Sequence, residues 1–230
     1  MNVLSLFDGM SCGQIALKNL GVKVDNYYAS EIDKYAIKIA KKNFPDMIHV
    51  GDVTKVSYSD YRGCLVVEKD SGYIQDIPKS RQIDLIIGGS PCQGFSRAGK
   101  NLNFDDPRSK LFFEFVRLIK ECKPKYFMLE NVKMTKEHRD TISNVLGVEA
   151  IYIDSALVSA QTRKRYYWTN IPYLFEPINQ HIILKDIIQT EGELEGSIVD
   201  ERMVTNKGKA YCLTARYDGA VWWNSIERSQ

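Results

Sequence analysis

The chain has 230 residues, a hydrophobic fraction of 44% and a formal net charge of +2. This length fits one large domain, or a domain with a small appendage, and the apolar content is enough to fill a core. The nearly balanced charge does not by itself indicate a nucleic-acid binder, so basic residues must be sought locally. No apolar run is long enough to span a membrane and the N-terminus lacks a signal-peptide pattern, so we expect no membrane partner.

The cysteines are scattered along the sequence, at Cys12, Cys64, Cys92, Cys122 and Cys212. Their number is odd and none forms a C-x-x-C pair, which argues against a disulfide framework and against a zinc site. We therefore expect no bound metal and a reducing compartment, the cytoplasm.

A strand, a glycine loop and a helix open the chain. The strand covers residues 3–7, and a turn at 8–13 precedes a helix at 14–20 that Gly21 ends. Because a helix N-terminus offers free N–H groups, such a unit suits a nucleotide-type ligand. The loop is not the G-x-G-x-x-G fingerprint, and an ordinary turn is the alternative.

The next two strands end in acidic residues. Residues 27–30 lead to Glu31, and Asp33 is placed to cap a helix at 34–44. An acidic residue at the end of the second strand of a βαβ unit commonly holds a ribose diol, whereas an isolated Glu31 would be a solvated charge. Asp52 ends a third strand, where it could accept from a purine amino group or act as a cap.

Between residues 54 and 82 the pattern weakens. Two tyrosine-rich pieces with Gly63 and Gly72 indicate a short helix and a hairpin outside the main sheet. We assign no chemistry to this excursion.

A cysteine follows the next buried strand, which covers residues 83–87. Cys92 stands between Pro91 and the turn at Gly94, on a loop that Gly88 and Gly89 begin. A residue on a stiff loop at a strand end lies where an open α/β sheet places its chemistry. The alternative is a small, inert core residue, the common state of a free cysteine.

A carboxylate follows the neighbouring strand. An amphipathic helix at 111–121 leads to a strand at 126–129, which delivers Glu130 at its end. Because a right-handed βαβ crossover puts both strand ends at the same edge of the sheet, we expect Cys92 and Glu130 to lie at one edge. A plain surface charge fits poorly with the four apolar residues that lead into Glu130.

A basic segment follows a helix at 135–146 and a strand at 150–154. Alternation places Gln161, Arg163 and Arg165 on one face of an extended stretch. Such a face suits an anion or a base edge, and an exposed basic strand is the alternative.

In order and spacing, these motifs resemble those of the DNA (cytosine-5)-methyltransferases over residues 2–170. The residues of these motifs are most similar to those of the animal de novo branch and its short bacterial and viral relatives. The motifs that carry the resemblance are Phe7-Asp8-Gly9, Glu31, Gly51-Asp52-Val53, Ser90-Pro91-Cys92-Gln93-Gly94-Phe95-Ser96, Glu130-Asn131-Val132 and Gln161-Thr162-Arg163-Lys164-Arg165.

The resemblance implies an α/β fold, with a doubly wound, mostly parallel sheet of the S-adenosylmethionine-dependent methyltransferase type and a small irregular recognition segment. It implies a catalytic domain at 1–170 and a target-recognition segment at 171–230. The family's closing C-terminal helix has no counterpart in this segment. We therefore expect a truncated chain or one completed by a second polypeptide, and the branch also allows a homodimer.

The implied activity is methylation of C5 in a flipped-out cytosine of double-stranded DNA. Cys92 would add to C6 of the base, and Glu130 would bond to N3 and the exocyclic amine. Arg163 and Arg165 would hold the base and its phosphate. S-adenosylmethionine would give the methyl group and leave as S-adenosylhomocysteine.

The resemblance also assigns contact residues. Those of the cofactor pocket are Phe7, Asp8, Gly9, Gly13, Glu31, Ile32, Asp52, Val53, Gly89, Pro91 and Leu111. Those of the substrate are Ser90, Gln93, Ser96, Asn131 and Gln161.

The implied setting is restriction-modification or viral self-protection, in the cytoplasm of a bacterium or viral host and associated with the nucleoid. One alternative is a tRNA cytosine-5 methyltransferase on the same scaffold. The other is a non-catalytic scaffold that binds DNA or a partner.

Overall fold

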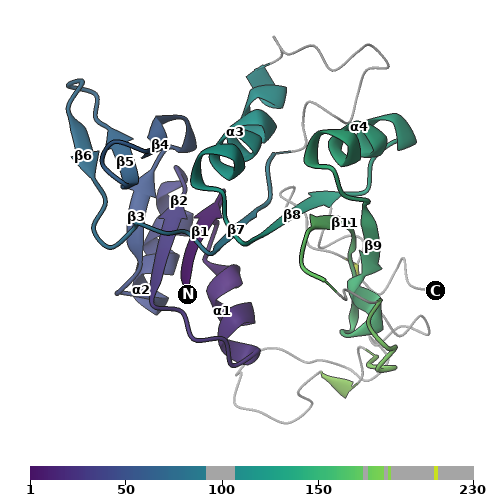
Figure 1. Ribbon diagram of the computed structural model, residues 1–230. Coiled ribbons are helices and arrows are strands. Elements are labelled where there is room, and N and C mark those ends of the chain that lie inside the picture. Colours follow the sequence, from purple (N-terminus) through teal and green to yellow (C-terminus); the bar gives the residue numbers. More distant parts are fainter. Residues whose placement is uncertain (92–106, 173–175, 184–185, 188–209, 212–230) are drawn as a thin grey trace. The chain divides into compact units, whose positions relative to one another are not determined.

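A computed structural model describes residues 1–91, 107–172, 176–183, 186–187 and 210–211 (Figure 1). Its main feature is a seven-stranded sheet in the order β3-β2-β1-β7-β8-β11-β9. The strands are β1 Asn2–Leu6, β2 Asn26–Ser30, β3 Ile48–Gly51, β7 Leu85–Gly88, β8 Tyr126–Val132, β9 Ile151–Asp154 and β11 Lys164–Thr169. β1 pairs in parallel with both β2 and β7, β2 with β3, and β7 with β8. The predicted parallel sheet is confirmed, and strand order reverses between β1 and β7, where such sheets bind ligands.

Two apolar faces follow from the alternation of side chains along the strands. Leu4 and Leu6 of β1 belong to one core cluster. Val3, one residue before Leu4, points to the opposite face and belongs to the other cluster. The first cluster includes residues of α3 (Pro107–Cys122) and α4 (Lys136–Leu146). The second packs against α1 (Cys12–Asn19) and α2 (Lys34–Asn43), so each face of the sheet is covered by its own helix pair.

The helix starts follow the predicted capping chemistry. The Asp33 carboxylate accepts hydrogen bonds from the backbone N–H groups of Tyr35 and Ala36, at 2.9 and 2.7 Å. This confirms Asp33 as the N-cap of α2. Thr135 caps α4 in the same way, and Gly147 ends that helix with φ at 69°.

The excursion after β3 forms its own antiparallel sheet, in the order β4-β5-β6. A 3₁₀ turn, η1 (Val53–Lys55), leads into β4 (Val56–Ser59), β5 (Cys64–Glu68) and β6 (Ile74–Asp76). The predicted position outside the main sheet is confirmed, but the expected short helix is only the η1 turn. The β-branched residues of β4 and β5 favour strands, and these two strands bury apolar side chains in the main core.

A second compact unit comprises residues 152–165 and 174–230, apart from the unit of 1–151 and 166–173. Its described elements include the 3₁₀ turn η2 (Ser155–Leu157) and a parallel pair, β10 (Gln161–Thr162) with β12 (Ala210–Tyr211). The predicted boundary between residues 170 and 171 stays a prediction. Within the described residues, no helix has the length and apolar character needed to cross a membrane.

Ser143→Ala should lower the free energy of unfolding by about 1–3 kcal/mol, because it leaves a buried indole N–H without its acceptor. Trp168 is fully buried, and its Nε1 donates to the Ser143 hydroxyl at 3.0 Å. Urea unfolding measures the change. Thr141→Ala is the matched control, since it removes an exposed hydroxyl from the same helix. An equal loss in both variants would contradict this account.

Candidate functional site

The register of the parallel strands brings the strand ends into one row. Gly51, Ser30, Leu6, Gly88 and Leu129 lie opposite one another across β3, β2, β1, β7 and β8. Because neighbouring strands are about 4.8 Å apart, the row spans roughly 19 Å, which suits an extended ligand. The residues that directly follow this row are all predicted site residues: Asp52, Glu31, Phe7, Gly89 and Glu130.

Glu31 closes the first loop with its carboxylate. Its Oε2 accepts from Gly9 N at 2.8 Å, and its Oε1 accepts from Ile32 N and Asp33 N at 2.8 and 2.9 Å. The His49 ring lies 3.0 Å from the Glu31 carbonyl oxygen. Carboxylate oxygens carry more acceptor sites than these bonds use, so Glu31 can also accept from the hydroxyls of a ligand.

Asp8 is bonded inside the same loop. The Tyr27 phenol donates to its Oδ1 at 2.7 Å, and the Ser11 hydroxyl donates to its Oδ2. Phe7 and Ser11 have φ values of 57° and 62°, a left-handed conformation that side chains other than glycine rarely adopt. The Asp8 bonds hold this loop geometry. A direct contact between Asp8 and a cofactor stays a prediction.

Gly13 allows the close approach of α1 to the sheet. A Cβ atom at this position would lie 2.4 Å from Ile87 Cδ1 and 2.8 Å from the Tyr27 hydroxyl. The glycine therefore leaves room for the phenol that bonds to Asp8. Its predicted contact with a cofactor stays a prediction.

Asp52 caps the η1 turn. Its Oδ1 accepts from the backbone N–H and the hydroxyl of Thr54, both at 2.9 Å, and the Ser30 hydroxyl holds the preceding Gly51 carbonyl at 2.8 Å. Val53 is 4% exposed. Among the described residues Asp52 Oδ2 has no hydrogen-bond partner. The carboxylate can therefore cap η1 and still accept from a ligand.

At the other end of the row, Glu130 lies beside Gly89. A Cβ atom on Gly89 would be only 3.1 Å from Glu130 Oε2. The next residue, Asn131, is 2% exposed and donates through Nδ2 to the Ser90 carbonyl at 3.2 Å. Its Oδ1 accepts from Val132 N at 2.8 Å. This buried amide ties the start of the cysteine loop to β8.

The loop itself is described only in part. Pro91 is exposed and is the last described residue of β7's loop. The predicted nucleophile Cys92 and the predicted contacts Gln93 and Ser96 lie outside the described residues. On α3, Leu111 is partly buried and packs against the core.

The predicted basic residues belong to the second unit. Gln161 lies in β10, and β11 begins at Lys164, so Arg163 separates two strands of the predicted extended stretch. Arg163 N donates to Asp154 Oδ1 at 3.0 Å, and Arg165 Nη1 donates to the Lys164 carbonyl at 2.8 Å. Their roles toward a base and its phosphate stay predictions.

Residues 1–150 match the family model described as C-5 cytosine-specific DNA methylase. This range contains the complete strand-end row and Glu130. The chain belongs to the C-5 cytosine-specific DNA methylase family.

This chain is similar to curated methyltransferases of a bacterium and a phage. It is 44% identical over 156 residues to the type II methyltransferase M1.ScrFI of Lactococcus lactis subsp. cremoris, covering 63% of this chain and 35% of that protein. It is 39% identical over 152 residues to the orphan methyltransferase M.SPRI of Bacillus phage SPR, covering 65% and 30%. The chain thus spans about a third of the length of these relatives.

Two solved structures resemble this chain. A DNA modification methyltransferase encoded within an E. coli prophage has 30% identity and a TM-score of 0.54, covering 74% of this chain and 46% of that chain. A mutant of Spodoptera frugiperda DNMT2 has 21% identity and a TM-score of 0.65, covering 95% and 71%. The second likeness concerns the fold alone. Together they confirm the fold of the S-adenosylmethionine-dependent methyltransferases.

Three residues that support the candidate site were not predicted as site residues from the sequence: Ser11, Tyr27 and Arg117. No local pattern links Tyr27 to Asp8, because their contact spans two elements. Arg117 carried a signal, since Glu114 and Glu121 stand three residues before and four after it on a predicted helix.

Tyr27 should make the folded chain lose stability above pH 10. Burial raises the pKa of this phenol well above its ordinary value of 10.0, and the charge of Asp8 adds to the shift. Above pH 10 the unfolded chain releases the phenol proton while the folded chain keeps it, so stability falls by up to about 1.4 kcal/mol per pH unit. Below pH 10 this contribution is constant.

Tyr27→Phe should therefore flatten the decline in urea-unfolding free energy between pH 10 and pH 11. Tyr61→Phe is the control, because that phenol is 98% exposed and should leave the slope unchanged. A Tyr27→Phe slope equal to that of the unsubstituted chain would refute the assignment.

Proposed function

We propose that this chain transfers a methyl group from S-adenosylmethionine to C5 of cytosine in double-stranded DNA. The observation that supports this most directly is the Glu130 carboxylate of β8 beside Gly89, which follows the end of the adjacent parallel strand β7. The predicted nucleophile, Cys92, follows three residues after Gly89 in the same loop. A carboxylate beside a cysteine loop is the arrangement that nucleophilic activation of a cytosine ring requires.

The chemistry divides between the thiol and the carboxylate. Cytosine C5 is a weak nucleophile, and addition of the Cys92 thiolate at C6 raises its electron density. Glu130 would hold N3 and the exocyclic amine, where charge changes as the adduct forms. S-adenosylmethionine supplies the electrophilic methyl group. Transfer of the C5 proton to solvent and cleavage of the bond between C6 and the Cys92 sulfur then release the methylated base and restore the Cys92 thiolate.

The cofactor side of the row fits an adenosyl group. Glu31 has acceptor capacity for the ribose hydroxyls, and Asp52 Oδ2 can accept from the adenine amino group. Phe7 and Val53 would line the ring, and Ile32, which is 75% exposed, offers further apolar surface.

The base side requires a flipped nucleotide. A cytosine inside a duplex cannot reach a strand-end loop, so it must leave the stack at a cost of a few kcal/mol. Arg163 and Arg165 would contact the base and its phosphate, and binding should weaken as salt rises. The bacterial and phage relatives fit restriction-modification or phage self-methylation, which would place the activity in the cytoplasm.

Cys92→Ala should abolish methyl transfer, because it removes the atom that bonds to C6. Glu130→Gln should slow transfer by roughly 100-fold, because the neutral amide stabilises the adduct less. The assay follows labelled methyl from S-adenosylmethionine into mixed-sequence duplex DNA, with tRNA as a parallel substrate.

The two variants also separate the alternatives. Label in DNA that persists in Cys92→Ala would contradict the proposed nucleophile. Label in tRNA alone would show that the chain is a tRNA methyltransferase. Cofactor binding without label in either substrate, with or without a second polypeptide, would favour a non-catalytic scaffold.

Glu31→Gln should weaken S-adenosylhomocysteine binding by at least about tenfold. The amide would point an N–H₂ group at the N–H of Gly9 or at those of Ile32 and Asp33, so the loop loses an acceptor as well as a charge. Isothermal titration calorimetry measures the dissociation constant. Glu137→Gln, an exposed change in the first turn of α4, is the control and should bind normally.

A further inference from the structure

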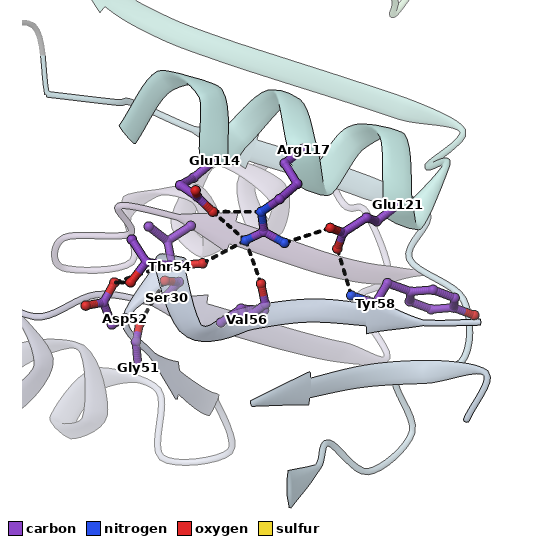
Figure 2. A network of polar contacts seen from close by, with 10 residues as sticks. Ser30, Gly51, Asp52, Thr54, Val56, Tyr58, Glu114, Arg117 and Glu121 are labelled. Carbon is purple, nitrogen blue, oxygen red and sulfur yellow. Dashed lines mark hydrogen bonds and ion pairs between the residues drawn. The ribbon is translucent and has the colours of Figure 1, made fainter. Parts of the chain in front are cut away.

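Arg117 joins helix α3 to the corner that carries Asp52 (Figure 2). Its Nη2 donates to the carbonyl oxygens of Val53 and Val56, at 3.2 and 2.7 Å. These carbonyls lie at the start of η1 and at the residue that ends it. The side chain thus spans the whole turn from a helix more than sixty residues later in the chain.

Two carboxylates fix the orientation of the guanidinium. Nε donates to Glu114 Oε2 and Nη1 to Glu121 Oε1, both at 2.8 Å. Glu121 Oε2 also accepts from Tyr58 N at 2.9 Å. The Arg117–Glu121 ion pair is therefore also bonded to β4, the strand that follows η1. A planar group with several donors can make all these bonds at once, whereas a lysine ammonium cannot.

The turn that Arg117 holds is part of the strand-end row. Asp52 is the N-cap of η1, and its position depends on the turn that its Oδ1 caps. Figure 2 shows the continuous path from Ser30 through Gly51 and Asp52 to η1 and then to the guanidinium. The same helix carries Leu111, which is predicted on the cofactor pocket. Arg117 therefore fixes Asp52 relative to α3.

We propose that Arg117 is a positioning residue for adenine recognition: by holding η1, it keeps the Asp52 carboxylate where it accepts from the adenine amino group. This inference rests on the proposed function, since it assigns the adenine end of the same cofactor site. Arg117 itself touches no ligand in this account. Substitution of Arg117 should change how well the site distinguishes a 6-amino purine from a 6-oxo purine, because this distinction depends on the position of the Asp52 carboxylate.

The test compares two ligands that differ at that position, S-adenosylhomocysteine and S-inosylhomocysteine. The 6-amino group of adenine donates to Asp52, whereas the 6-oxo group of hypoxanthine is an acceptor and repels it. The unsubstituted chain should prefer the adenosyl ligand. Arg117→Lys should weaken that ligand roughly tenfold and leave the inosyl ligand nearly unchanged, so the ratio of dissociation constants falls.

Two controls separate positioning from general stability. Arg62→Lys makes the same substitution in an exposed ion pair with Asp76 on the small sheet, away from η1. Ser143→Ala destabilises the same unit through Trp168. Both should keep the preference of the unsubstituted chain, because neither changes the position of Asp52.

Glu121→Gln gives a milder second variant, which keeps the arginine and weakens one of its anchors. It should lower the preference in the same direction by a smaller factor. An unchanged ratio in Arg117→Lys and Glu121→Gln would overturn the positioning role while leaving the proposed function intact. Failure of the unsubstituted chain to bind S-adenosylhomocysteine would overturn the proposed function, and this inference with it.

Discussion

The register of the parallel strands is the constraint on which the site depends. Backbone pairing sets Gly51, Ser30, Leu6, Gly88 and Leu129 side by side, so the loops after them begin at one level. A slip of one residue would turn each apolar side chain to the opposite face. Both faces are packed by helices, so such a slip would disrupt the packing of both core clusters at once. Packing far from the loops thus holds the acidic residues in line.

Several features could be predicted from local chemistry because their causes are local. A short apolar run followed by an acidic residue or a glycine marks a buried strand and its end, and this was sufficient at Glu31 and Asp52. At Glu130 the predicted end was wrong, because β8 continues to Val132. Asp33 was predicted as a cap because an aspartate caps a helix through its own next few N–H groups. The right-handed crossover then placed β7 and β8 side by side, and Glu130 lies next to Gly89 as a result.

The features that were missed depend on contacts between distant residues. The sequence shows Asp8 only as a loop residue. In the structure its carboxylate accepts hydrogen bonds from Tyr27 and Ser11, and these bonds hold the conformation of the loop. The segment at 54–82 was expected to include a short helix. Strands β4 and β5 are stabilised by packing on the main core, which a window of local residues does not contain. The Arg117 contacts to Val53 and Val56 have the same origin.

Helix α3 connects the two ends of the site. Phe115 packs so closely on Gly88 that a Cβ atom there would lie 3.0 Å from the ring, at the start of the cysteine loop. Two residues later, Arg117 holds the turn capped by Asp52, which follows Gly51 at the β3 end of the row. A rigid helix cannot move at one of these points and stay fixed at the other. The base side and the adenine side are therefore set by one element, and a displacement of α3 would disturb both together.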